Sequence, residues 1–148
     1  MASSGPVAPE TVRIAEESYQ RCQREAFFHA FYDRLLSQGE EIRRKFARTD
    51  FAQQTKQLQH GLGLLFIYAK HGNPVMLERV AARHGPSDVD APPAMYPLFM
   101  DTLLATVKEF DAKCSADVER AWRQALAPGL AYMCDYYTRH AGPPATRA

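Results

Sequence analysis

The sequence contains few cysteines, and they lie far apart. Only Cys22, Cys114 and Cys134 occur among the 148 residues, and no two of them form a C-x-x-C motif. Disulfide frameworks and structural zinc sites need more cysteines at closer spacing. The cysteine pattern therefore excludes a disulfide-stapled domain, a zinc module and covalent cofactor attachment through paired cysteines, and we interpret the three thiols as buried or bystander side chains.

An excess of charge of one sign is also absent. The chain has 18 Lys and Arg against 17 Asp and Glu, a net charge of +1, whereas nucleic-acid binders usually carry a basic stripe. It has no run of about 18 apolar residues for a membrane span, and its N-terminus lacks the features of a signal peptide. G-x-S-x-G, P-loop and G-x-G-x-x-G motifs are missing. We therefore expect a cytoplasmic protein that binds neither nucleic acid nor a membrane.

What the sequence does have is helical periodicity along a chain of single-domain length. Apolar residues recur at i, i+3, i+4 and i+7, and strand-like alternation is almost absent. The pattern predicts an all-α domain of six or seven helices at 9–140, between flexible tails at 1–8 and 141–148. The predicted helices cover 9–21, 24–37, 50–70, 73–84, 96–110 and 115–139, with a short turn at 40–46 and a proline-rich connector at 85–93.

Three glycines carry specific expectations. Gly39 follows the helix predicted at 24–37, and we expect it to supply a left-handed cap. Gly61 and Gly63 lie inside the helix predicted at 50–70, where each costs about 1 kcal/mol of helix propensity. Either a close helix crossing or the close approach of a ligand would explain these two glycines.

Four polar side chains fall on otherwise apolar helix faces: Tyr32, Gln54, His84 and Tyr96. Burying such a group without a partner costs about 1–3 kcal/mol, so each needs a partner in the protein or in a ligand. For His84 two interpretations stay open, a metal ligand or a histidine favoured by the dipole at a helix C-terminus. No second ligand lies at zinc spacing, so a metal at His84 would need the other ligands that a porphyrin supplies.

The order of these features resembles the globin family, especially bacterial single-domain haemoglobins and the globin domain of flavohaemoglobins. The resemblance spans about residues 9–140 and implies a globin fold of six to eight helices around a haem pocket. It rests on the segments 31–36 (FYDRLL), 42–46, 54–58 (QTKQL) and 80–84 (VAARH), followed by Val89, Tyr96-Pro97, Leu103-Leu104 and Ala121-Trp122.

The resemblance implies a site around haem b. His84 matches the proximal histidine that binds iron. Tyr32 and Gln54 match the distal residues that hydrogen-bond a bound gas, and Gln53 is the alternative to Gln54 at that position. Tyr96 matches a tyrosine beneath the proximal side. The other residues that the resemblance places around haem are Phe46, Leu58, Leu62, Val80, Arg83, Val89 and Phe99. One departure is Tyr137, which stands where related proteins carry a glutamate beneath the proximal histidine, so an electronic push from that side is in doubt.

The resemblance implies three alternative functions. The first is a b-type haem protein that reversibly binds dioxygen, CO and NO, as in oxygen transport. The second is a nitric-oxide dioxygenase working with a separate reductase, since no reductase domain is visible among these residues. The third is a gas-sensing module that signals to a partner protein. A homodimer is a further candidate assembly.

Overall fold

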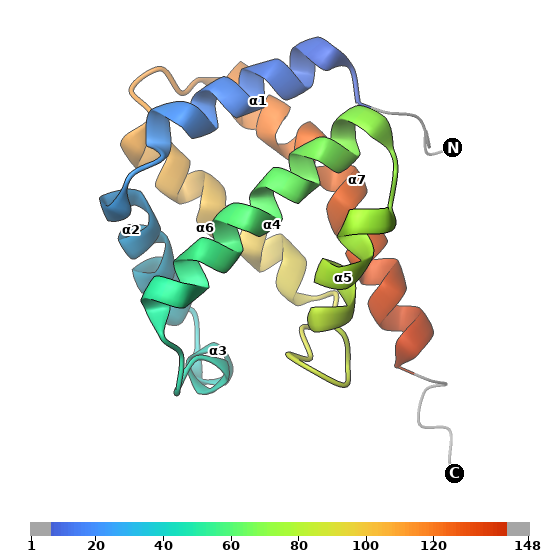
Figure 1. Cartoon of the computed structure of the whole chain (residues 1–148). Coiled ribbons are helices and arrows are strands. Elements are labelled where there is room, and N and C mark those ends of the chain that lie inside the picture. Colours follow the sequence, from blue (N-terminus) through green and yellow to red (C-terminus); the bar gives the residue numbers. More distant parts are fainter. Residues whose placement is uncertain (1–6, 142–148) are drawn as a thin grey trace.

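Seven α-helices make up the described part of the chain. The structure is a computed structural model that describes residues 7–141, and no strand occurs within that range. The all-α prediction is confirmed, and the predicted helices occur with ends shifted by one or two residues. The helices, shown in Figure 1, are α1 (Pro9–Cys22), α2 (Glu25–Leu36), α3 (Glu40–Lys45), α4 (Phe51–His71), α5 (Val75–Arg83), α6 (Met95–Phe110) and α7 (Ala116–His140).

The helix ends follow from local chemistry. The Asp50 carboxylate caps α4 by accepting hydrogen bonds from the N–H groups of Ala52 and Gln53, and the Ser115 hydroxyl caps α7 in the same way. The end of α4 is a left-handed glycine, Gly72, with φ 69°. These caps fix where the two longest helices begin and where α4 ends.

The segment 40–46 and Gly39 differ from the prediction. Residues Glu40–Lys45 form the helix α3 rather than a turn, with acidic residues in its first turn and basic residues in its last, as the helix dipole favours. Only Ile42 of this helix is buried, so six residues gave too little apolar periodicity to reveal it. The predicted left-handed cap at Gly39 is wrong, because α2 ends in the right-handed residue Ser37 and Gly39 is extended at φ 161°.

The helices cross in two packed groups. α1, α4 and α5 pack on α7, while α2 packs on α6 (Figure 1). At the crossing of α4 and α7, a Cβ on Gly129 would press into Leu65, so glycine allows the close contact there. For Gly61 and Gly63, the explanation by a close helix crossing is wrong. A Cβ at either position would meet no atom within 4 Å apart from its own helix backbone and its chain neighbours. The largest fully buried side chains include Trp122, Phe27, Phe28 and Phe31.

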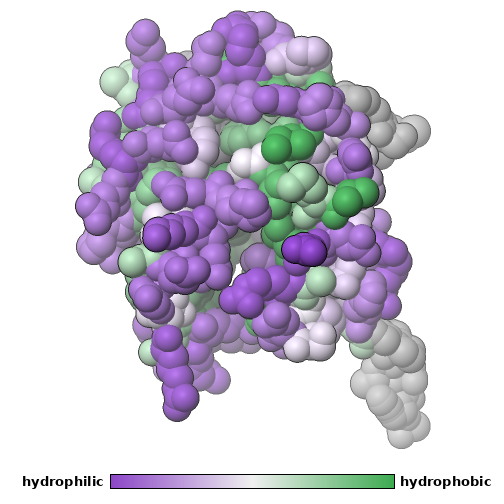
Figure 2. Space-filling view, viewed as in Figure 1, coloured by the Kyte–Doolittle hydropathy of each residue, from purple (hydrophilic) through white to green (hydrophobic). Residues whose placement is uncertain are grey.

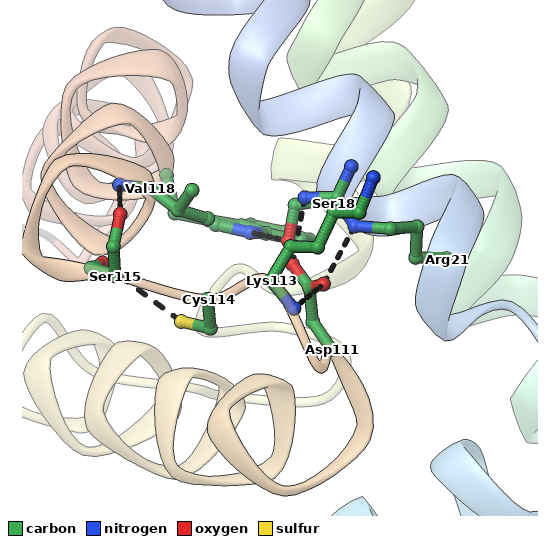
Figure 3. A network of polar contacts seen from close by, with 8 residues as sticks. Ser18, Arg21, Asp111, Lys113, Cys114, Ser115 and Val118 are labelled. Atoms are coloured by element: carbon green, nitrogen blue, oxygen red, sulfur yellow. Dashed lines mark hydrogen bonds and ion pairs between the residues drawn. The ribbon is translucent and has the colours of Figure 1, made fainter.

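A buried polar network ties α1 to the turn between α6 and α7. Ser18 donates to the Asp111 carboxylate at 2.6 Å, and Trp122 Nε1 donates to Ser18 at 2.8 Å. Arg21 reaches both carboxylate oxygens, at 2.6 and 2.9 Å, and the Lys113 N–H adds a further bond at 2.9 Å (Figure 3). The network holds three separate elements in register at the end of the molecule that α1 covers.

The first residue of the described range also packs on the core. Val7 lies against the core cluster and donates its N–H to the carbonyl of Ala69 at 2.9 Å. Residues 1–6 and 142–148, which make up most of the predicted tails, lie outside the described residues. Within residues 7–141, no helix combines the length and the apolar character needed to cross a membrane.

Candidate functional site

A cavity of about 1000 Å³ lies between α2, α3, α4, α5, α6 and the connector that follows α5. Figure 2 looks onto α4 and α5 and shows the surface hollowed between them, with mostly hydrophilic residues at the edge. Every predicted site residue lines this cavity: Tyr32, Phe46, Gln53, Gln54, Leu58, Leu62, Val80, Arg83, His84, Val89, Tyr96 and Phe99. Their convergence is a property of the fold, since they come from six segments of the chain.

Tyr32 presents a neutral hydroxyl to the cavity. Its ring is buried, and it packs edge-on against Phe46 and Phe51 with centroids 5.9 and 5.4 Å away. Burial raises the pKa of Tyr32 to about 12, so the hydroxyl stays protonated at neutral pH. It donates to the backbone carbonyl of Gln54 at 3.4 Å, which is long for an O–H donor. This hydroxyl can therefore turn to a better acceptor at small cost.

The two candidate glutamines differ in exposure. Gln54 is half-buried on the inner face of α4, whereas Gln53 is exposed. Both line the cavity, one turn before Leu58. Burial therefore favours Gln54 as the side chain that faces a bound molecule.

His84 is held in one tautomer at the end of α5. Its Nδ1 lies 2.8 Å from the carbonyl oxygen of Val80. Because a carbonyl can only accept, this bond places the ring hydrogen on Nδ1 and leaves Nε2 with a free lone pair. Burial lowers the pKa of His84, which favours the neutral, metal-binding form. Among residues 7–141, no three His, Cys, Asp or Glu side chains gather to hold a metal ion, so a metal on His84 needs non-protein ligands.

Tyr96 is one of three buried polar groups that the described chain does not satisfy, beside Tyr19 and Arg34, and it is the one that lines the cavity. Its hydroxyl is fully buried, and no hydrogen-bond partner for it occurs among the described residues. Burial raises the pKa of Tyr96, so the group stays neutral. Tyr137 does not serve this side of the cavity. Its hydroxyl donates to the Asp90 carboxylate at 2.6 Å, outside the cavity lining, so Tyr137 gives His84 no hydrogen bond in this structure.

The rim of the cavity is basic. Lys45, Lys56, Arg79 and Arg83 line it, and no Asp or Glu among residues 7–141 does. Lys45 reaches from α3 to the connector, where its ammonium donates to the carbonyls of Val89 and Asp90 at 3.2 and 2.7 Å. Sequence reasoning missed Lys45, Lys56 and Arg79, although the basic run around Lys45 was a visible signal.

The fold and the cavity define a globin, and comparison with solved structures agrees. A crystal structure of the Pseudomonas aeruginosa PAO1 protein PA3967, described as structurally highly homologous to a human hemoglobin, superposes with a TM-score of 0.82. The two chains are 34% identical over 86% of this chain and 98% of the other. No family model and no curated protein matches the sequence. The chain belongs to the globin family, as its sequence resemblance predicted.

Proposed function

We propose that this globin binds haem b in the cavity through His84 and reversibly binds dioxygen, CO and NO there. The observation that carries the proposal is the state of His84. Its Nδ1 is anchored to Val80, its Nε2 is free, and it lines the cavity without a protein co-ligand among the described residues. A lone imidazole of this kind fits a metal whose other ligands belong to a macrocycle.

The cavity fits such a group in size and polarity. A volume of about 1000 Å³ lies at the upper end of the ordinary range for small-molecule sites, roughly 300–1000 Å³. Phe46, Val80 and Phe99 offer apolar surface to a flat ring, with Leu58, Leu62 and Val89 completing the walls. Arg83 suits a carboxylate at a porphyrin edge.

When bound, haem would supply an iron with an open position for a diatomic gas. The residues of the chain set the surroundings of that position. The Tyr32 hydroxyl and the Gln54 amide, which line the cavity, would donate to a polar gas bound there, and a hydrogen bond is stronger where water is excluded. Leu58 and Leu62 exclude water from the same space, which protects the reduced state.

The test is the visible absorption spectrum of the purified protein mixed with haem, taken ferric, dithionite-reduced and reduced with CO. We expect a sharp Soret band that shifts with CO. His84→Ala should weaken haem binding by more than about 100-fold, beyond the 10–100-fold loss typical of outer-shell partners.

The matched control is His60→Ala, which removes an exposed histidine from the rim of the same cavity. It should keep the wild-type spectrum and CO shift. A CO-sensitive Soret band that survives in His84→Ala but disappears in His60→Ala would overturn the assignment of the ligand. The absence of any haem uptake by the wild-type chain would overturn the proposed function.

A further inference from the structure

We infer that the basic rim of the cavity, defined by Lys45, Lys56, Arg79 and Arg83, is a docking surface for an acidic electron-donor protein. The inference rests on the proposed function, because dioxygen binds only to reduced iron. A globin whose iron has been oxidised needs one electron before it can bind dioxygen again. In that step the donor loses one electron and the cofactor gains it, with no bond or proton exchanged.

The two outermost cations of the rim lack carboxylate partners. Lys56 lies on α4 and Arg79 on α5, on the two helices that flank the hollow in Figure 2, and both are exposed. Within residues 7–141, no carboxylate approaches either group within the 4 Å of an ion pair, although most other cationic side chains on the helices have one. Both charges are therefore free to meet an anionic partner.

Three carboxylates in the segments that flank the rim are occupied inside the chain. Asp50 caps α4, and Asp88 faces Arg83 at 3.6 Å. Asp90 accepts the hydroxyl of Tyr137, and the carbonyl of the same residue accepts from Lys45. None of these carboxylates lines the cavity. The charged side chains that line the opening among the described residues are therefore all basic, although the whole chain carries a net charge of only +1.

A bound cofactor leaves part of this charge uncompensated. Among the described residues, four Lys and Arg side chains line the cavity, and Asp88 already faces one of them, Arg83. Haem b brings two further carboxylates, so a positive charge of one remains. Electron donors exchange electrons efficiently when they approach the cofactor edge, and opposite charge at that edge speeds and orients the approach. The remaining positive charge therefore lies at the edge of the cavity, where an electron-donor protein would have to bind.

Exposed apolar side chains at the same rim favour a protein as the occupant. Val75 and Met76 line the cavity from the start of α5 and expose 69% and 57% of their surface. Methionine and arginine are enriched in protein–protein interfaces, where an apolar centre is surrounded by polar groups. In Figure 2 hydrophobic residues gather beside the hydrophilic edge of the hollow. A nucleic acid or a lipid headgroup would use the cations but not this apolar pair.

The experiment measures binding of a purified flavodoxin chosen for acidic residues around its flavin. Calorimetric titration gives the dissociation constant for the cofactor-free and the haem-reconstituted protein, at low and high salt. We expect the double variant Lys56→Glu/Arg79→Glu to bind about tenfold more weakly than wild type at low salt, as expected for lost charge complementarity. Added salt should weaken the wild-type complex and hardly affect the variant.

The matched control is Lys113→Glu/Arg120→Glu, which makes the same net change at exposed positions outside the cavity lining. Its binding should equal that of the wild type. Equal losses in the two double variants, or a wild-type affinity that salt does not change, would overturn the proposal. Tighter binding of the wild type to phosphatidylglycerol vesicles or to a DNA duplex than to flavodoxin would also overturn it.

A second readout separates this proposal from the proposed function. Stopped-flow absorbance follows the transfer of one electron from reduced flavodoxin to the reconstituted ferric protein. The rate should fall in Lys56→Glu/Arg79→Glu while its Soret band with CO stays that of the wild type. A chain that takes up no haem would refute the proposed function in the spectrum alone, whereas a chain with a normal spectrum and an unchanged rate refutes the docking surface alone.

Discussion

The end of the molecule where α1 crosses α7 and the end around the cavity differ in how far their buried polar groups are satisfied, although the Tyr19 hydroxyl of the first region also lacks a partner among the described residues. In the first region Asp111 receives bonds from Ser18, Arg21 and a backbone N–H, and Trp122 completes the network. In the second region the Tyr96 hydroxyl has no partner among the described residues, and the Tyr32 hydroxyl has only a long bond.

This difference indicates where stability and where binding are located. Buried polar groups are nearly always satisfied in native proteins, so an open group on the wall of a cavity, such as the Tyr96 hydroxyl, indicates a partner from outside the chain. The packed region around Asp111 can hold the fold together without a ligand. Around the cavity some packing contacts and hydrogen bonds are missing, and a bound molecule can supply them. The following changes should act on one region and spare the other.

The largest effect should come from the cofactor itself. Haem present at 1000 times its dissociation constant should raise the free energy of unfolding by about 4 kcal/mol, as mass action requires. Hydrogen exchange followed by mass spectrometry should show the strongest local slowing in 40–46 and 84–94. Slowing confined to α1 and α7 would contradict the comparison. In His84→Ala, most of the unfolding free energy that haem adds should be lost.

Removal of the central carboxylate should damage the packed region. Asp111→Ala leaves Ser18 and Arg21 without their shared partner and should lower the free energy of unfolding by about 3 kcal/mol. Urea unfolding of the cofactor-free protein measures this loss. Asp117→Ala, at an exposed position in the first turn of α7, is the control and should change stability by less than about 0.5 kcal/mol. An equal loss in both variants would show that the network is not special.

Acid should act through the same residue. Burial alone would raise the pKa of Asp111, but hydrogen bonds from Arg21, Ser18 and the Lys113 N–H outweigh it and lower the pKa. A lowered carboxylate pKa adds stability above the unfolded value, and this stability is lost as the pH falls through the folded value. Unfolding free energies should therefore drop steeply below about pH 4 in the wild type and less in Asp111→Ala. Parallel pH curves would refute this assignment.

A smaller effect should follow from Tyr32→Phe, confined to the cavity. Loss of one hydroxyl donor in a dry site costs about 1.4 kcal/mol, equivalent to tenfold faster dissociation of dioxygen. Stopped-flow or flash photolysis of the reconstituted protein measures that rate. Tyr19→Phe changes a buried tyrosine of the packed region and should leave the rate unchanged. If both substitutions speed dissociation equally, Tyr32 does not face the gas.

The smallest effect should come from Tyr137→Phe. This change removes the bond that holds Asp90, which has the left-handed φ of 60° that non-glycine residues rarely adopt. The bond is exposed, so the loss of global stability should stay below about 1 kcal/mol. Hydrogen exchange in 85–94 should still become faster, with α1 unaffected. Unchanged exchange in that connector would show that the bonds from Lys45 and the backbone hydrogen bonds of the connector are sufficient to hold it.

Local patterns were sufficient to predict most of the helices and to single out four of the residues that line the cavity, and the family resemblance supplied the others that were named. Tyr32, Gln54, His84 and Tyr96 stood out because each interrupts an apolar stripe at helical spacing, and all four line one cavity. α3 escaped prediction because only one of its residues is buried. Gly61 and Gly63 could not be interpreted from sequence, because the space beside a helix depends on which helices cross it.

The amino-acid sequence by itself determined where the helices lie and which of their faces are apolar, because both follow from interactions within a few residues. Only the tertiary structure decided which distant groups meet. Asp111 accepts a hydrogen bond from Ser18, 93 positions away in the sequence. Tyr137 donates to Asp90, 47 positions away, and does not reach the space beneath His84. The same crossings brought Lys56 and Arg79 to one rim. Such contacts depend on the angles at which helices pack, and side-chain packing over the whole core sets those angles.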